Sequence, residues 1–118
     1  GKQPYLIGLK GEEPFAFAGL WERWQGRDEA VIESFTIIVT EANELLRPIH
    51  ERMPVILDPS DYDLWLEGGP EAAPKARELL RPYPAEQMAA YAVSRRVNNP
   101  RYDDPECIAP LRETGAPA

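Results

Sequence analysis

The sequence predicts an α+β fold, with antiparallel strands in its first third and short helices further along the chain. Residues 33–40 are almost entirely β-branched or aromatic, which favours a strand. The 13 prolines among 118 residues argue against a helical bundle, because proline removes a helical hydrogen bond and clashes with the preceding turn. Cap-forming residues border short segments after the midpoint, which indicates helices of only a few turns.

Three strands are expected in order near the N-terminus, over residues 4–9, 15–24 and 33–40. Residues 10–14 contain the glycine and proline of a hairpin turn, and residues 25–29 form a polar loop. Because consecutive strands joined by short turns pair antiparallel, these segments predict a meander.

The remaining elements are shorter. Asp58 offers a cap oxygen, Pro59 fits the first helical position and Gly68 ends the segment, so residues 58–67 predict a helix. We further expect one or two helical turns over residues 41–46, strands over 53–57 and 88–94, a helix over 73–80, and loop between Val97 and Ile108. The predicted domain covers residues 1–113, and residues 114–118 are predicted to be a flexible tail.

Charge and composition disfavour several classes of function. The chain carries 13 Lys and Arg against 20 Asp and Glu, a net charge of −7, which disfavours the histone-like mode of nucleic-acid binding. A local basic groove remains compatible with this balance. A single cysteine rules out an internal disulfide and suggests a reducing compartment. No apolar stretch approaches the roughly 18–20 residues of a membrane span, so a soluble intracellular protein without a membrane partner is expected.

His50 is the only histidine, within Arg-Pro-Ile-His-Glu-Arg-Met-Pro at residues 47–54. An imidazole can donate, accept or carry charge near neutral pH, which suits general acid–base catalysis. Two flanking prolines, the neighbouring Arg47 and Arg52, and a following buried strand would hold the ring rigidly. The residues alone leave two interpretations open, a catalytic imidazole and a hydrogen-bonded structural one.

Metal binding has no support in the sequence. One histidine and one distant cysteine cannot supply a zinc shell, and the acidic residues lack calcium-loop spacing, so neither metal nor cofactor is expected. A Cys107–His50 pair would suit a thiol hydrolase, because a thiolate needs a nearby base. The alternative, which we prefer, is that Cys107 is a small buried apolar side chain.

Aromatic and cationic residues interleave at residues 21–24 (Trp-Glu-Arg-Trp), and two arginines stand at residues 95–96. Guanidinium and indole planes suit phosphates and unstacked bases, so these residues could line a groove for single-stranded DNA. Core tryptophans with surface arginines are the ordinary alternative.

Six segments resemble the SOS response-associated peptidase (SRAP) family, in the family's order and over nearly all of residues 2–111. The most specific is Pro-Ile-His-Glu-Arg-Met-Pro at residues 48–54, and Val-Ser-Arg-Arg-Val-Asn at 93–98 supports it independently. The others are residues 2–5, 18–22, 37–43 and 104–108, and the 48–54 motif continues to residue 57. The resemblance implies a mainly antiparallel, curved or barrel-like sheet with short flanking helices, here as the C-terminal part of an SRAP domain.

The resemblance also implies a function. Family members sense abasic sites in single-stranded DNA: an N-terminal cysteine, exposed by self-removal of the initiator methionine, forms a thiazolidine crosslink with the opened sugar. His50 matches the family histidine that handles protons. Thr40 and Arg52 match positions near the DNA backbone, and Arg96 and Asn98 are further candidates on the DNA side. A cytoplasmic, nucleoid-associated bacterial protein is implied.

Several family features have no counterpart in these residues. The sequence lacks the N-terminal Cys-Gly-Arg segment and the stretch that carries the catalytic glutamate; Glu22 stands at a different position, and Cys107 matches no nucleophile. We therefore expect this polypeptide alone to form no crosslink, and its sheet edges to be open. The alternatives are a non-catalytic module that binds DNA or forms a homo-oligomer through an open sheet edge, and the thiol hydrolase.

Overall fold

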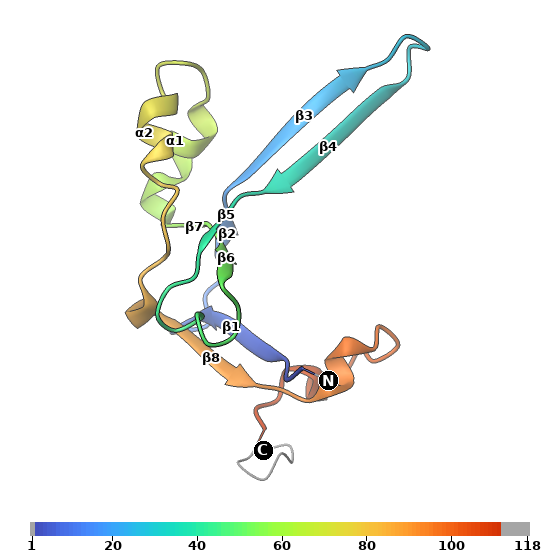
Figure 1. Ribbon diagram of the computed structural model, residues 1–118, viewed down its shortest axis with the longest axis vertical. Coiled ribbons are helices and arrows are strands. Elements are labelled where there is room, and N and C mark those ends of the chain that lie inside the picture. The colour runs from blue at the N-terminus through green and yellow to red at the C-terminus, as the bar shows by residue number, and fades with distance from the viewer. Residues whose placement is uncertain (1, 112–118) are drawn as a thin grey trace. The chain divides into compact units, whose positions relative to one another are not determined.

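A computed structural model describes residues 2–111 of the chain (Figure 1). Its contacts divide into two compact units. One unit contains residues 14–85, and the other combines residues 2–13 with residues 86–111. The expectation of one domain over residues 1–113 stays a prediction, and the tail expected at 114–118 lies outside the described residues.

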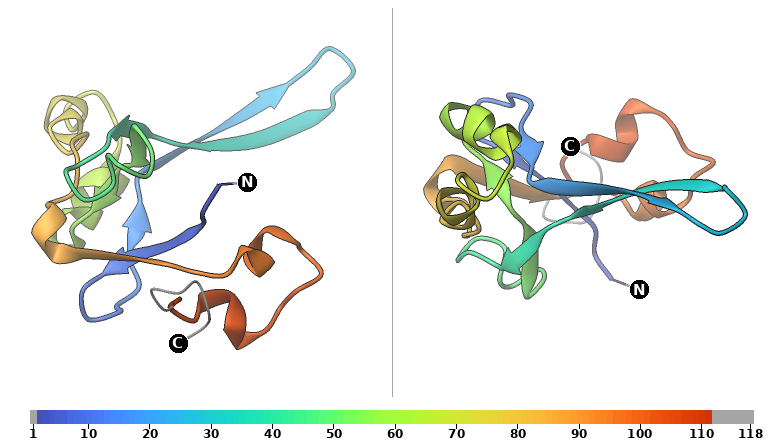
Figure 2. Two further views of the ribbon diagram at one scale, coloured as in Figure 1. Left: turned by 60° about the horizontal axis from the view of Figure 1, so that its bottom comes forward. Right: turned by 90° about the horizontal axis from the view of Figure 1, so that it is seen from above.

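The unit formed by the two ends of the chain is built on one antiparallel strand pair, visible in Figure 2. Strand β1 (Tyr5–Leu9) pairs with β8 (Met88–Ala92), from Tyr5 opposite Ala92 to Leu9 opposite Met88. Two 3₁₀ helices follow β8, η3 (Arg95–Asn98) and η4 (Pro105–Ile108), in a segment that we expected to be mostly loop.

The predicted meander is wrong at its first step. The chain does turn after β1, where the Glu12 N–H donates to the Leu9 carbonyl at 3.0 Å and Gly11 has a φ of 95°. However, β1 pairs with β8, some eighty positions away, and the Lys10 N–H extends that ladder to the Gln87 carbonyl at 2.9 Å. Turn residues indicate where a chain reverses, but they do not determine which strand becomes the partner.

The other unit contains three antiparallel pairs. In order along the chain, β2 (Ala16–Phe17) pairs with β7 (Ile56–Leu57), β3 (Gly19–Gln25) with β4 (Val31–Ile37), and β5 (Val39–Glu41) with β6 (Arg52–Pro54). The β3–β4 pair is a long hairpin that projects from its unit, as Figures 1 and 2 show. The α+β class and the antiparallel pairing are thus confirmed, in open two-stranded sheets.

Each of the three predicted strands 15–24, 33–40 and 53–57 breaks at one residue, where it changes partner. Ala18 donates its N–H to Val55 at 2.8 Å, Val55 donates to Ile38 at 2.9 Å, and Ile38 donates back to Ala18 at 2.9 Å. This closed ring of backbone hydrogen bonds joins the three ladders. Ala18 and Val55 are completely buried, and together with Leu57 and Leu79 they form the hydrophobic cluster of this unit.

Short helices follow β7, and Tyr62, Leu64 and Trp65 pack against that cluster. The predicted helix over 58–67 is present as η1 (Pro59–Asp61) followed by α1 (Tyr62–Glu67), and Gly68 ends it with a φ of 69°. Helix α2 (Ala73–Arg77) is shorter than predicted, and η2 (Ala85–Gln87) precedes β8. The helical turns expected over residues 41–46 are instead hydrogen-bonded turns over 44–49. Among residues 2–111, no helix has the length and apolar character required to cross a membrane.

Candidate functional site

His50 lies at the end of the loop that joins β5 to β6. The loop is closed at its base, where the Ala42 N–H donates to the Glu51 carbonyl at 2.9 Å. Inside it, the Leu46 carbonyl accepts hydrogen bonds from the N–H groups of Ile49 at 2.8 Å and His50 at 2.9 Å. The backbone of His50 is therefore fixed by two consecutive turns rather than by a helix.

Asn43 fixes the start of the same loop. It is the only buried polar or charged residue of the described chain, with 8% of its surface exposed. Its side-chain oxygen accepts from the Leu46 N–H at 3.0 Å, and its amide nitrogen donates to the Tyr83 carbonyl at 2.8 Å. Since Tyr83 is forty positions away, Asn43 connects the His50 loop to the segment that follows α2.

The His50 ring is exposed and turned onto the backbone of Arg52. Its Nδ1 atom lies 3.0 Å from the Arg52 nitrogen and 3.1 Å from the Arg52 carbonyl oxygen. A neutral ring with the proton on Nε2 accepts the Arg52 N–H, whereas an imidazolium donates its Nδ1–H to the carbonyl. Nδ1 thus has a partner on the Arg52 backbone in either protonation state, but the Arg52 N–H has its acceptor only when the ring is neutral. Nε2 takes part in no hydrogen bond with any other described residue.

The pairing register of β5 with β6 determines on which face of the ladder Thr40 and Arg52 lie. Thr40 lies opposite Met53, while Arg52 lies opposite Glu41. Because neighbouring residues of a strand point to opposite faces, Thr40 and Arg52 are on opposite faces of the β5–β6 ladder. Thr40 is half-buried on the face of the buried Met53. Arg52 is exposed, and among the described residues no ion pair engages its guanidinium.

Arg96 and Asn98 belong to the other unit, on η3. Ser94 caps the start of this helix, because its hydroxyl accepts the Arg96 N–H at 3.1 Å. The Arg96 guanidinium lies 3.4 Å from the Asp104 carboxylate and 4.9 Å from the centre of the Tyr102 ring. Arg96 is therefore already held by a carboxylate and an aromatic ring, whereas Asn98 is exposed at the end of η3.

Cys107 is buried in η4, as the preferred interpretation expected. Its Sγ lies 3.8 Å from the Tyr102 carbonyl, which acts as a weak acceptor for the thiol. Nucleophilic cysteines are accessible and lie close to a base or cation, so this setting is that of a packing side chain.

Two residues that hold these candidate side chains, Asn43 and Asp104, were not predicted from the sequence. Asn43 directly follows a strand, and asparagine commonly hydrogen-bonds the backbone of a turn that it begins, which was the available signal. The Asp104–Arg96 contact had no signal, because the spacing of eight residues matches no regular element. In residues 2–111, no group of three or more His, Cys, Asp or Glu side chains could hold a metal ion.

The family model of the SOS response associated peptidase (SRAP) matches residues 1–100, and the chain belongs to that family. The motifs at residues 48–54 and 93–98, which carried the resemblance, lie within this match. The first forms the end of the β5–β6 loop and all of β6, and the second begins directly after β8 and includes η3.

Two curated relatives are named abasic site processing proteins. The chain is 43% identical to the abasic site processing protein YoqW of Bacillus subtilis over 91% of its own length and 48% of the relative's. It is 33% identical to the abasic site processing protein HMCES of Gallus gallus, over 99% of this chain and 40% of that protein. The chain thus spans less than half the length of these two curated relatives.

Solved structures share the fold. A crystal structure of a Bacteroides thetaiotaomicron protein matches 95% of this chain and 50% of its own, with a TM-score of 0.78 and 28% sequence identity. A Bordetella bronchiseptica protein matches 78% of this chain and 46% of its own, with a TM-score of 0.67 and 32% identity.

Proposed function

We propose that this chain is part of a protein that processes abasic sites in single-stranded DNA, and that His50 is its proton-transfer residue. Membership of the SRAP family and the names of the relatives YoqW and HMCES support the substrate. The observation that supports this role for His50 is its geometry: Nδ1 contacts the Arg52 backbone, and the residue is exposed.

The proposed chemistry starts from the sugar of an abasic site, which opens to an aldehyde. In the proposal, the α-amine of an N-terminal cysteine, supplied by the part of the SRAP domain outside these residues, adds to the aldehyde carbon. Loss of water gives an imine, and the cysteine sulfur adds to the same carbon to close a thiazolidine ring. The second step is intramolecular and therefore strongly favoured. That cysteine would first be exposed by removal of the initiator methionine.

His50 supports this sequence by moving protons at Nε2. As an imidazolium it protonates the sugar ring oxygen or the departing hydroxyl, and as a neutral base it takes the proton back. The Arg52 backbone stabilises both forms in turn, so the ring does not need to rotate between the two steps.

Phosphate contacts are proposed for four further residues. Arg52 offers an exposed guanidinium beside His50, and Thr40 a hydroxyl on the opposite face of the ladder. Arg96 and Asn98 serve on η3, where Asp104 offsets part of the Arg96 charge. We expect Arg52 to contribute more to phosphate binding than Arg96, because a guanidinium without a carboxylate partner attracts an anion more strongly.

Denaturing gel electrophoresis tests the proposed function. A polypeptide that carries these residues together with the rest of an SRAP domain is incubated with single strands containing uracil, treated with uracil glycosylase. A slower band that survives denaturation is expected with treated strands and not with untreated strands. The 118-residue chain alone is expected to give no such band. The absence of a band from the complete domain would contradict the proposed function.

A further inference from the structure

The β3–β4 hairpin exposes an unusual amount of apolar surface. Every residue of β4 is exposed, and so is every residue of β3 after Gly19. Trp21 is 71% exposed and Phe35 is 79% exposed. The other large exposed apolar side chains of the hairpin are Leu20, Trp24, Val31, Ile32 and Ile37. Soluble proteins seldom leave contiguous apolar surface of this kind uncovered.

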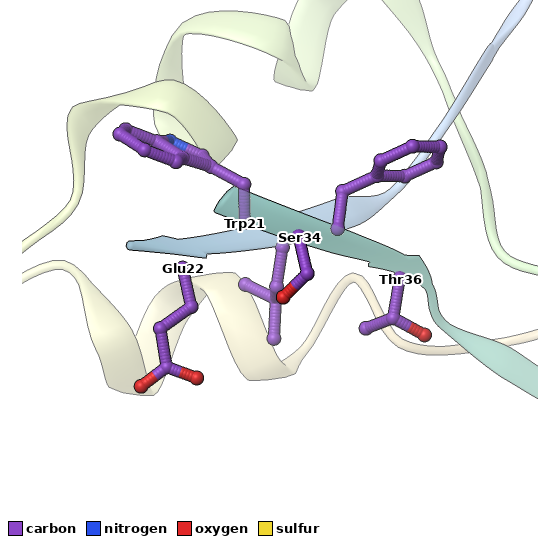
Figure 3. A pocket seen from close by; sticks show the side chains of 6 residues that line it. Trp21, Glu22, Ser34 and Thr36 are labelled. Carbon is purple, nitrogen blue, oxygen red and sulfur yellow. The ribbon is translucent and has the colours of Figure 1, made fainter. Parts of the chain in front are cut away.

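These side chains occupy both faces of the hairpin. Trp21 lies opposite Phe35, and the two point to one face. Trp24 lies opposite Ile32 on the other face. Figure 3 shows the division at the base of the hairpin, where Trp21 points away from Glu22, Ser34 and Thr36. A pocket of about 440 Å³ is lined there by residues of both strands.

The hairpin is also open at its edges. β3 and β4 pair only with each other among the described residues, so each strand has an outer edge without a neighbour. A two-stranded hairpin is at best marginally stable alone in water, and its free backbone groups are a template for an added strand. Only its base is supported, where the Trp65 indole N–H donates to the Gly19 carbonyl at 3.1 Å.

The charge of the hairpin argues against DNA as the occupant of this surface. Between residues 19 and 37 the sequence contains two arginines, Arg23 and Arg27, and four acidic residues. Arg23 faces Glu33, with 4.0 Å between the nearest charged atoms. A surface that attracts phosphates needs a surplus of cations, which is lacking here.

We propose that the β3–β4 hairpin is an interaction surface for a polypeptide, namely the part of the SRAP domain that relatives possess beyond the region matched by this chain. That polypeptide adds a strand to an outer edge and packs apolar side chains on the Trp21–Phe35 face. The lengths of the relatives support this occupant. The matched region is about half of YoqW and half of the Bacteroides protein, so each of them has about as many residues outside the match as inside it. This inference concerns assembly and does not depend on the activity proposed above.

Co-expression tests this surface. The 118-residue chain is produced with a tagged polypeptide that spans the part of YoqW outside the match, and retention of the chain on the tag is measured. Phe35→Ser is expected to weaken the association about tenfold or more, about 1.4 kcal/mol or more. Leu66→Ser is the matched control, because Leu66 lies on α1 with the same 79% exposure, and it should leave the association unchanged. Circular dichroism checks that both variants keep the fold of the chain.

Hydrogen exchange adds a readout along the hairpin. Amides of residues 19–37 should exchange more slowly in the complex than in the chain alone, while amides of β1 and β8 should change less. Three results would overturn the proposal: no association, equal weakening by Phe35→Ser and Leu66→Ser, or unchanged exchange in the hairpin. A chain that dimerises alone and becomes monomeric with Phe35→Ser would assign the surface to a second copy and would also overturn it. No abasic DNA is used, so failure here is distinguishable from failure of the proposed activity.

Discussion

At the scale of single residues, the candidate site depends on how the backbone holds His50. The ring has its Nδ1 on Arg52, and the His50 backbone is fixed by the Leu46 carbonyl. The Leu46 N–H is bound in turn by the Asn43 side chain. Asn43 is therefore a positioning residue, since it acts on the imidazole through the loop and not on DNA.

Asn43→Ala should destabilise the fold and loosen the His50 loop. The substitution withdraws the side-chain hydrogen bonds to Leu46 and Tyr83, which at a buried site is expected to cost about 2–4 kcal/mol. Urea unfolding of the chain measures this cost. Glu44→Ala, an exposed change in the same loop, is the control and should fall within about 0.5 kcal/mol of the parent. Equal stability of the two variants would show that Asn43 does not hold the loop.

At the scale of elements, small side chains and caps determine where strands and helices meet. The ring of hydrogen bonds between Ala18, Ile38 and Val55 lets three strands exchange partners at one point. Ala18 is 0% exposed, so a larger side chain has no room there without movement of the surrounding strands.

Ala18→Val is therefore expected to destabilise the chain by about 1–3 kcal/mol through overpacking. Ala89→Val serves as the control, because Ala89 is exposed in β8, where a β-branched residue is favourable. Thermal unfolding compares the two variants. If Ala18→Val were as stable as Ala89→Val, the junction would have to be looser than the structure describes.

Asp58, at the start of the η1–α1 segment, is expected to make the stability of the fold depend on pH. Hydrogen bonds from the Ser60 backbone N–H and hydroxyl lower the pKa of Asp58 below its ordinary value of 3.8. A carboxyl with a lower pKa in the folded state stabilises the fold at every pH above the unfolded pKa. That contribution is lost as the pH falls through the folded pKa.

Asp58→Asn retains a cap oxygen but removes the charge, so it isolates this effect. The parent should exceed Asp58→Asn in stability at neutral pH, and the difference should shrink below about pH 4. Urea midpoints measured between neutral and acidic pH provide the comparison. Asp103→Asn, an exposed change in a loop, should show no such convergence. A difference that stays constant down to acid would refute the role of the Asp58 charge.

At the scale of the whole molecule, the sequence predicted the class of fold, the antiparallel pairing and the helix over 58–67. These follow from local chemistry: β-branched runs, a cap oxygen and a proline at the first helical position. The pairing of β1 with β8 and the break of three strands at Ala18, Ile38 and Val55 could not be predicted, because both depend on contacts between distant segments.

For the candidate site, the sequence suggested residues but not their arrangement. His50 and Arg52 could be singled out because the motif at residues 48–54 is distinctive. The sequence could not indicate that Thr40 and Arg52 lie on opposite faces of a ladder, since this depends on the pairing register. Nor could it indicate that Asp104 and Tyr102 hold Arg96, because that contact forms only when η3 and η4 pack together.

The most direct measurement is the initial rate of covalent capture of abasic single strands by the complete SRAP domain, compared between His50→Ala and Glu51→Gln. Glu51 is the exposed neighbour of His50 and has no proposed part in the reaction. We expect His50→Ala to slow capture about a hundredfold or more, within the range typical of general acid–base catalysis, while Glu51→Gln retains the parental rate. Capture by His50→Ala at the rate of Glu51→Gln would contradict the role assigned to this imidazole.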